Sequence, residues 1–193
     1  MKRLLLAFLI PSLLALPAFA ALKAGDTAPD FTAPATLAGK PFTFSLKSAL
    51  KKGPVVVYFY PSAYTQGCNI QAHTFSVNSD KFAAAGASII GVSQDSITRL
   101  NRFSADPSYC AGKFPTASDA NGAIAKSFDL KVMDARPDAK DTNGDVIDHG
   151  FTERTTFIIT PDGKIIQTVG GVAPDKNVEA ALAVVQGLPG KKT

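Results

Sequence analysis

The sequence comprises 193 residues, of which 46% are hydrophobic, and its 20 lysines and arginines exceed its 16 acidic residues by four. A chain of this length fits one domain, which buries roughly 70% of the surface exposed by the unfolded chain and needs no disulfide for stability. The small charge excess gives no sign of a nucleic-acid or acidic partner.

The first 20 residues have the pattern of a secretory signal peptide. Lys2 and Arg3 precede a largely apolar stretch, residues 4–16, and an Ala-Phe-Ala sequence ends at Ala20. A membrane anchor is the alternative, but the apolar stretch is short and is broken by proline. We therefore predict cleavage near Ala20, a periplasmic or secreted protein without a membrane segment, and a single domain over residues 21–193.

Residues 21–50 alternate between turns and short β-like runs. The turns fall at residues 28–30 and 38–41, and the β-like runs at residues 31–32 and 42–44. We expect an N-terminal hairpin packed beside a central sheet.

The next stretch, residues 55–60, reads Val-Val-Val-Tyr-Phe-Tyr. It is too short for a helix and too uniformly apolar for a half-exposed strand, so we expect a buried central strand that ends at Pro61. Residues 66–85 contain no proline and precede Gly86, a suitable C-cap, which predicts a helix. Cys68 then lies in the first turn of this helix, where unpaired N–H groups and the helix dipole favour a thiolate over a thiol.

Strands and helices alternate further along the chain. Residues 87–93 are expected to form a second buried strand, which runs parallel to the first because a helix connects the two. Ser96 is a suitable N-cap for another helix, and Cys110 lies in an irregular segment beyond that helix. Asp119 or Ser118 is expected to open a short helix.

A polar surface loop, a hairpin and a closing helix complete the predicted elements. The loop spans residues 132–149; the acid spacing at residues 141–145 resembles a calcium loop but lacks its glycine and bidentate glutamate, so we expect an Asx-rich turn. Residues 155–160 and 164–169 predict an antiparallel hairpin, and Pro174 suits the first position of the last helix. This order predicts a thioredoxin-like α/β fold with a central mixed sheet flanked by helices.

The two cysteines allow two interpretations. In an exported protein the oxidising compartment favours one structural disulfide between Cys68 and Cys110. The position of Cys68 at the start of a helix favours a reactive thiol instead.

Two distant motifs resemble those of the peroxiredoxins. Pro61, Thr65 and Cys68 match the P-x-x-x-T-x-x-C active-site motif of that family, and residues 153–159 are similar to the strand that brings its catalytic arginine, here Arg154. The resemblance covers nearly all of the chain after residue 20 except the loop described above. Similarity to the bacterioferritin-comigratory (peroxiredoxin Q) subfamily adds four short segments, residues 28–31, 58–61, 114–119 and 160–164.

This resemblance implies a thiol peroxidase that reduces hydrogen peroxide or organic hydroperoxides without metal, haem or flavin. Cys68 would be the peroxidatic thiolate, Thr65 would position sulfur and peroxide, and Arg154 would stabilise the thiolate and the transition state. Pro61 would shield the thiolate from water. The amides of Gly67 and Cys68 would help to bind the peroxide oxygen.

The resemblance also implies a second cysteine that captures the resulting sulfenic acid. Many members of the subfamily carry it five residues after the first, where this chain has His73. Other members carry it in a segment similar to residues 109–115, which favours an intramolecular Cys68–Cys110 disulfide. The first helical turn would unwind to form this bond if the two Cα atoms lie more than about 7 Å apart. We further expect a periplasmic thioredoxin-like reductant and a monomer.

Two alternatives stay open at this point. A thioredoxin-like disulfide oxidoreductase normally needs a C-x-x-C motif, whereas Asn-Ile-Gln follows Cys68. A thioredoxin-fold binding protein would instead hold Cys68 and Cys110 in a permanent disulfide. His73 and His149 are the only histidines, which are too few for a convincing metal site.

Overall fold

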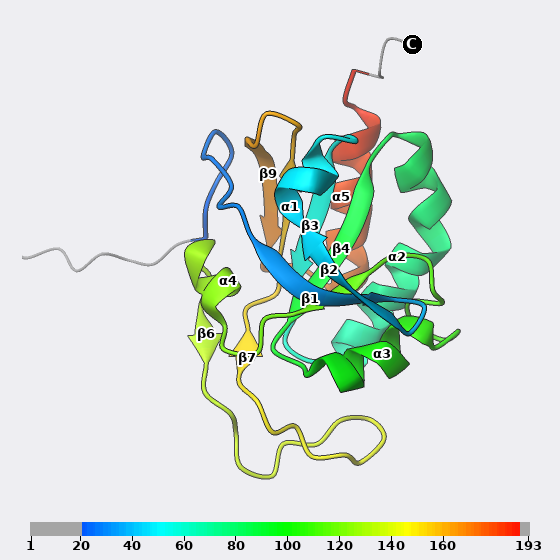
Figure 1. The fold of residues 1–193 in the computed structure, drawn as a ribbon, viewed down its shortest axis with the longest axis vertical. Helices are drawn as coiled ribbons and strands as arrows, with labels where there is room; N and C mark the ends of the chain where they lie inside the picture. The colour runs from blue at the N-terminus through cyan, green and yellow to red at the C-terminus, as the bar shows by residue number, and fades with distance from the viewer. Residues whose placement is uncertain (1–20, 190–193) are drawn as a thin grey trace, which may run out of the picture.

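The computed structural model describes residues 21–189. Its centre is a seven-stranded sheet in the order β2-β1-β5-β4-β3-β8-β9, with helices on both faces (Figure 1). The elements in chain order are β1 (Thr32–Leu37), β2 (Lys40–Ser45), α1 (Leu46–Leu50), β3 (Val55–Phe59), α2 (Gln66–Ala84), β4 (Ser88–Ser93), α3 (Ile97–Ala105), β5 (Thr116–Ser118), α4 (Ala123–Ser127), β6 (Val132–Met133), β7 (Phe151–Thr152), β8 (Thr155–Ile159), β9 (Ile165–Gly170) and α5 (Pro174–Gln186). This arrangement confirms the predicted mixed sheet flanked by helices.

Strand β3 lies near the middle of this sheet, and all five of its residues are buried. It pairs in parallel with β4, as predicted from the connecting helix, and antiparallel with β8. Because successive side chains of a strand point to opposite faces, β3 contributes to two cores. Val56 and Tyr58 pack with residues of α2, α3 and α5, whereas Val55, Val57 and Phe59 pack with residues of α1 and α4.

The connection from β3 to α2 forms the turn that presents the first cysteine. Strand β3 ends at Phe59, and Thr65 is the N-cap of α2. Helix α2 ends just before Gly86, whose φ of +75° is a left-handed conformation that glycine adopts at little cost. The predicted helix and its C-terminal glycine are therefore confirmed.

The N-terminal hairpin is a continuous part of the main sheet. Strands β1 and β2 pair antiparallel, which confirms the hairpin. Strand β1 also pairs with β5, a strand that the sequence analysis did not predict. Because β5 has only three residues and follows Pro115, it has too little alternating pattern to be recognised.

The loop at residues 132–149 has internal structure that composition did not reveal. Strands β6 and β7 pair at its base, and Lys140 forms an isolated bridge with Val146. The Asp141 carboxylate accepts hydrogen bonds from two backbone N–H groups, two and four residues further on, at 2.8 and 3.0 Å. These bonds confirm the predicted Asx-rich turn.

Helix α4 begins later than predicted, with Gly122 at its N-cap. Asp119 nevertheless caps this helix, because its carboxylate accepts the N–H groups of Ile124 and Ala125 at 3.0 and 2.9 Å. Strands β8 and β9 form the predicted antiparallel hairpin, and α5 begins at Pro174, as predicted.

Within residues 21–189 no helix combines the length and apolar character needed to cross a bilayer. The predicted signal peptide, residues 1–20, lies outside the described residues.

Candidate active site

Cys68 is the third residue of α2, and only 1% of its surface is exposed. Thr65, the N-cap, has an extended backbone, but its side chain makes no capping bond to the helix. Its hydroxyl instead donates to the carbonyl oxygen of Ser62 at 2.8 Å. The N–H groups of the first turn, including those of Gly67 and Cys68, thus have no side-chain acceptor from the N-cap and can serve an anion.

Arg154 brings a positive charge against this sulfur. It directly precedes β8, whose Thr155 pairs with Phe59 at the end of β3, so the register of the sheet places Arg154 beside the start of α2. Its Nη2 atom donates to Cys68 Sγ at 3.3 Å. A cation at hydrogen-bonding distance and the positive end of a helix both favour the thiolate form of a cysteine.

A chain of buried amides holds the guanidinium in place. Arg154 Nη1 donates to Gln71 Oε1, and Gln71 Nε2 donates to Asn177 Oδ1 at 3.0 Å. Asn177 Oδ1 also accepts from the Thr156 hydroxyl at 2.5 Å, and Asn177 Nδ2 donates to the Val169 carbonyl oxygen at 2.9 Å. These residues could not be recognised from the sequence, because a buried Gln or Asn carries no periodic signal that identifies its partner.

Gly67 allows the arginine to approach the helix. A Cβ atom at this position would lie 3.0 Å from Arg154 Nη2 and 3.3 Å from Pro174 Cγ. Because both distances are shorter than ordinary van der Waals contact, any larger residue would displace the guanidinium or α5.

The structure therefore brings Cys68, Gly67 and Arg154 into one site. Thr65 borders the site at the N-cap, with its hydroxyl turned to the Ser62 carbonyl rather than to the sulfur. Pro61 is half-buried in the turn that follows β3.

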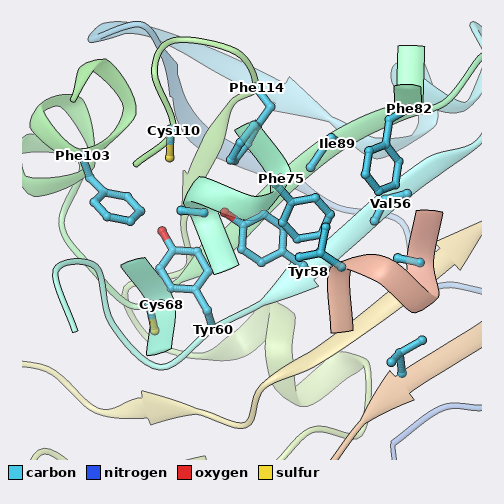
Figure 2. Close-up of a cluster of buried hydrophobic side chains, with 14 of the residues drawn as sticks. Val56, Tyr58, Tyr60, Cys68, Phe75, Phe82, Ile89, Phe103, Cys110 and Phe114 are labelled. Atoms are coloured by element: carbon cyan, nitrogen blue, oxygen red, sulfur yellow. The ribbon is translucent and has the colours of Figure 1, made fainter. Parts of the chain in front are cut away.

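The second cysteine lies in the same core cluster but in another segment. Cys110 is fully buried in the irregular stretch between α3 and β5, and both cysteines are free thiols. Figure 2 shows the ring of Tyr60 between the two sulfur atoms. Burial, and then the charge of Asp106, raise the pKa of the Cys110 thiol far above its ordinary value. In this conformation Cys110 is a poor nucleophile.

His73, at the position where many relatives have a second cysteine, lies on the exposed side of α2. Its Nδ1 atom is 3.2 Å from the carbonyl oxygen of Ser108, in the segment that contains Cys110. Across residues 21–189, acidic, histidine and cysteine side chains form no group of three or more that could hold a metal ion.

A buried cysteine at the start of a helix, in contact with a guanidinium at the end of a central strand of a mixed sheet, defines a thiol enzyme built on a thioredoxin-like fold. The chain belongs to the AhpC/TSA family, whose model matches residues 24–168. It is thus a peroxiredoxin-type thiol peroxidase, an oxidoreductase.

Individual relatives agree with this assignment. A putative peroxiredoxin of Mycobacterium tuberculosis is 31% identical over 168 residues, which cover 86% of this chain and 98% of that protein. Peroxiredoxin Bcp of Xanthomonas campestris is 31% identical over 132 residues, which cover 68% of this chain and 76% of that protein.

Solved structures agree as well. The crystal structure of peroxidoxin BcpB from M. tuberculosis superposes with a TM-score of 0.71 at 30% identity, covering 87% of this chain and 99% of that one. The bacterioferritin comigratory protein of X. campestris superposes with a TM-score of 0.62 at 30% identity, covering 79% and 89%.

Proposed function

We propose that this peroxiredoxin reduces hydrogen peroxide and organic hydroperoxides at Cys68 through a sulfenic acid. The observation that supports this most strongly is the 3.3 Å contact between Arg154 Nη2 and Cys68 Sγ at the N-terminus of α2. The X. campestris relative is described as having alkyl peroxide reduction activity, which supports the inclusion of organic hydroperoxides.

In the first step the Cys68 thiolate attacks the terminal oxygen of the peroxide. An S–O bond forms, the O–O bond breaks, and the departing oxygen takes up a proton to leave as water or an alcohol. Arg154 and the N–H groups of Gly67 and Cys68 stabilise the negative charge that moves onto the peroxide oxygens. Thr65 orients the peroxide, and Pro61 keeps water from the sulfur.

In the second step the Cys110 thiol attacks the oxidised sulfur of Cys68. An S–S bond forms, the S–O bond breaks, and the hydroxyl leaves with the Cys110 proton as water. Both thiols are buried, and the Tyr60 ring lies between them (Figure 2). The first turn of α2 and the segment around Cys110 therefore have to rearrange before the sulfurs meet.

A thioredoxin-like protein then supplies two electrons to reopen the disulfide, since such reductants are typical of the family. We place the mature chain in the periplasm as a monomer. This location rests on the pattern of residues 1–20, and it requires the reductant to be periplasmic too.

Single-turnover kinetics of the reduced protein test these steps. Stoichiometric hydrogen peroxide is mixed with the wild type, Cys68→Ser and Cys110→Ser, and the disulfide content is followed by quenching and mass spectrometry. We expect fast oxidation that only Cys68→Ser abolishes, and a disulfide only in the wild type. Slow oxidation of both thiols at equal rates would instead favour a binding protein with a structural disulfide.

A further inference from the structure

A buried cluster of charges lies directly behind the turn that precedes α2. Asp95, which follows β4, is fully buried, and its Oδ1 atom lies 2.9 Å from Arg99 Nε and 2.9 Å from His149 Nε2. Arg99 Nη2 lies 2.6 Å from Asp141 Oδ2. The thiol chemistry proposed above uses none of these four residues, which come from two segments of the chain, residues 95–99 and the loop at residues 132–149.

This cluster anchors the turn at residues 62–64 from several sides. Asp95 Oδ2 accepts the Ala63 N–H at 2.8 Å, and Asp95 Oδ1 accepts the Ser62 hydroxyl at 3.1 Å. Arg99 Nη2 donates to the Ala63 carbonyl oxygen at 3.0 Å. The Ser93 hydroxyl completes the shell of the carboxylate with a bond of 2.6 Å.

The loop at residues 132–149 adds a second attachment to the same turn. Thr142 donates both its N–H and its hydroxyl to the Tyr64 carbonyl oxygen, at 2.9 and 2.7 Å. Tyr64 has a φ of +61°, a left-handed conformation that a non-glycine residue keeps only when its surroundings enforce it. Arg99 lies over the Tyr64 ring at 5.2 Å.

The geometry around His149 selects its charged form. Nε2 faces the Asp95 carboxylate at 2.9 Å, and Nδ1 faces the Gly150 carbonyl oxygen at 2.7 Å. The Ser62 hydroxyl also lies 3.4 Å from Nε2. Because the two nearer partners, a carboxylate and a carbonyl oxygen, can only accept, both ring nitrogens must carry a proton, which defines an imidazolium. A neutral imidazole has one N–H and would lose one of these two bonds.

The other groups around the pair favour the same charge state. Burial lowers the pKa of His149, but the hydrogen bond and charge of Asp95, with smaller contributions from Gly150 and Asp148, raise it above 6.5 overall. Burial also favours the neutral form of Asp95 and so raises its pKa. Hydrogen bonds from His149, Ser93 and Ala63 nevertheless hold the pKa of Asp95 below its ordinary value. Two further charged or titratable groups face Asp95: the Arg99 cation, and the Tyr60 phenol, which burial keeps neutral by raising its pKa well above the ordinary value.

We propose that Asp95 and His149 are positioning residues that hold the 62–64 turn, and hence the first turn of α2, in the conformation where Cys68 meets Arg154. Deprotonation of His149 weakens this hold. The inference rests on the proposed function, in which a folded first turn reacts with peroxide and a rearranged one forms the disulfide. Protonated His149 thus favours the first step, and neutral His149 favours the second.

The direction of the pH effect follows from linkage. A histidine whose pKa is raised in the folded state contributes stability that is complete below its unfolded pKa and is lost as the pH rises through the folded value. The turn is therefore held most firmly in mildly acidic solution and loosens toward alkaline pH.

His149→Gln tests this role because glutamine keeps one neutral N–H donor but does not titrate. We expect the wild type to react with hydrogen peroxide about tenfold faster than His149→Gln at about pH 6, and at nearly the same rate at about pH 9. The reason is that the substitution removes a charge-assisted hydrogen bond only at the lower pH, where His149 of the wild type is protonated. Any pH effect on the rate that the two proteins share divides out of this ratio. His73→Gln, which changes the only other histidine, should keep the wild-type profile.

The rate of disulfide formation provides a second readout, because the substitution should change it in the opposite direction to the rate of the peroxide reaction. At about pH 6, His149→Gln should form the Cys68–Cys110 bond faster than the wild type, although it reacts more slowly with peroxide. A ratio of peroxide rates that is the same at both pH values would overturn the proposal.

Hydrogen exchange of the wild type needs no substitution and does not depend on peroxide chemistry. The Ala63 N–H should lose protection between the two pH values, beyond the intrinsic pH dependence of exchange, whereas amides of the central strand β3 should not. If the wild type failed to react with peroxide but lost exchange protection at Ala63 alone, the proposed function would be wrong, whereas the positioning of the 62–64 turn by Asp95 and His149 would be supported. Unchanged protection of the Ala63 N–H would contradict the proposal that His149 and Asp95 position this turn.

Discussion

Gly67→Ala tests whether the contact between arginine and sulfur controls the reaction with peroxide. The added Cβ would lie 3.0 Å from Arg154 Nη2, so the guanidinium must move by a few tenths of an ångström or more. Gln71 restrains the other nitrogen of the guanidinium, which limits how it can move without lengthening the 3.3 Å bond to Cys68.

The expected magnitude follows from the strength of this bond. A hydrogen bond to a charged group contributes about 1.5–3 kcal/mol, and losing roughly half of it slows the reaction about three- to tenfold. Alanine in place of glycine favours a helix by up to about 1 kcal/mol, which offsets the strain of the close contacts with Arg154 and Pro174, so the free energy of unfolding should change little. Activity and stability are thus predicted to move separately.

Stopped-flow mixing with hydrogen peroxide measures the rate, and chemical denaturation measures the stability. Gly187→Ala is the matched control: Gly187 lies at the end of α5 with an ordinary φ of −79°, and its Cβ would meet no atom closer than 3.5 Å. An undiminished peroxide rate in Gly67→Ala, with the fold intact, would refute the argument that Arg154 must contact the sulfur.

Three further substitutions test the site and its support. Arg154→Gln removes the cation and should slow oxidation of Cys68 roughly ten- to a hundredfold in stopped-flow assays. Gln71→Leu removes one hydrogen-bond partner from Arg154 and one from Asn177, so both the peroxide rate and the denaturation midpoint should fall; an unchanged rate would show that other contacts suffice to hold Arg154. Gly91→Ala would place a Cβ 2.6 Å from Tyr58 Oη and should cost about 1–3 kcal/mol of unfolding free energy, while a neutral result would mean that the Tyr58 ring moves freely.

Local patterns account for the parts of the fold that the sequence predicted. The apolar run of β3 and the glycine that ends α2 act over a few neighbouring residues, so each could be recognised without knowing the rest of the chain. Strand β5 was not predicted because its three residues form a strand only by pairing between β1 and β4, which are distant in sequence. Short strands of this kind depend on tertiary contacts rather than on their own pattern.

The same distinction applies to the site. Cys68 could be recognised from its position at a helix start, but Arg154 was identified only through the family resemblance. The amide chain could not be predicted, since Gln71 and Asn177 are 106 residues apart. Asp95 and His149, 54 residues apart, also read as ordinary polar residues. Their pairing arises because the loop at residues 132–149 packs against the end of β4, a contact between distant parts of the chain.

Mapping the oxidised sulfur tests the central claim most directly. Reduced Cys110→Ser is treated with one equivalent of hydrogen peroxide in the presence of a sulfenic-acid trapping reagent, and tandem mass spectrometry locates the adduct. We predict labelling of Cys68 within seconds, and no labelling when Cys68 is also replaced by serine. A protein that reacts with peroxide but acquires no adduct at Cys68 would contradict the account.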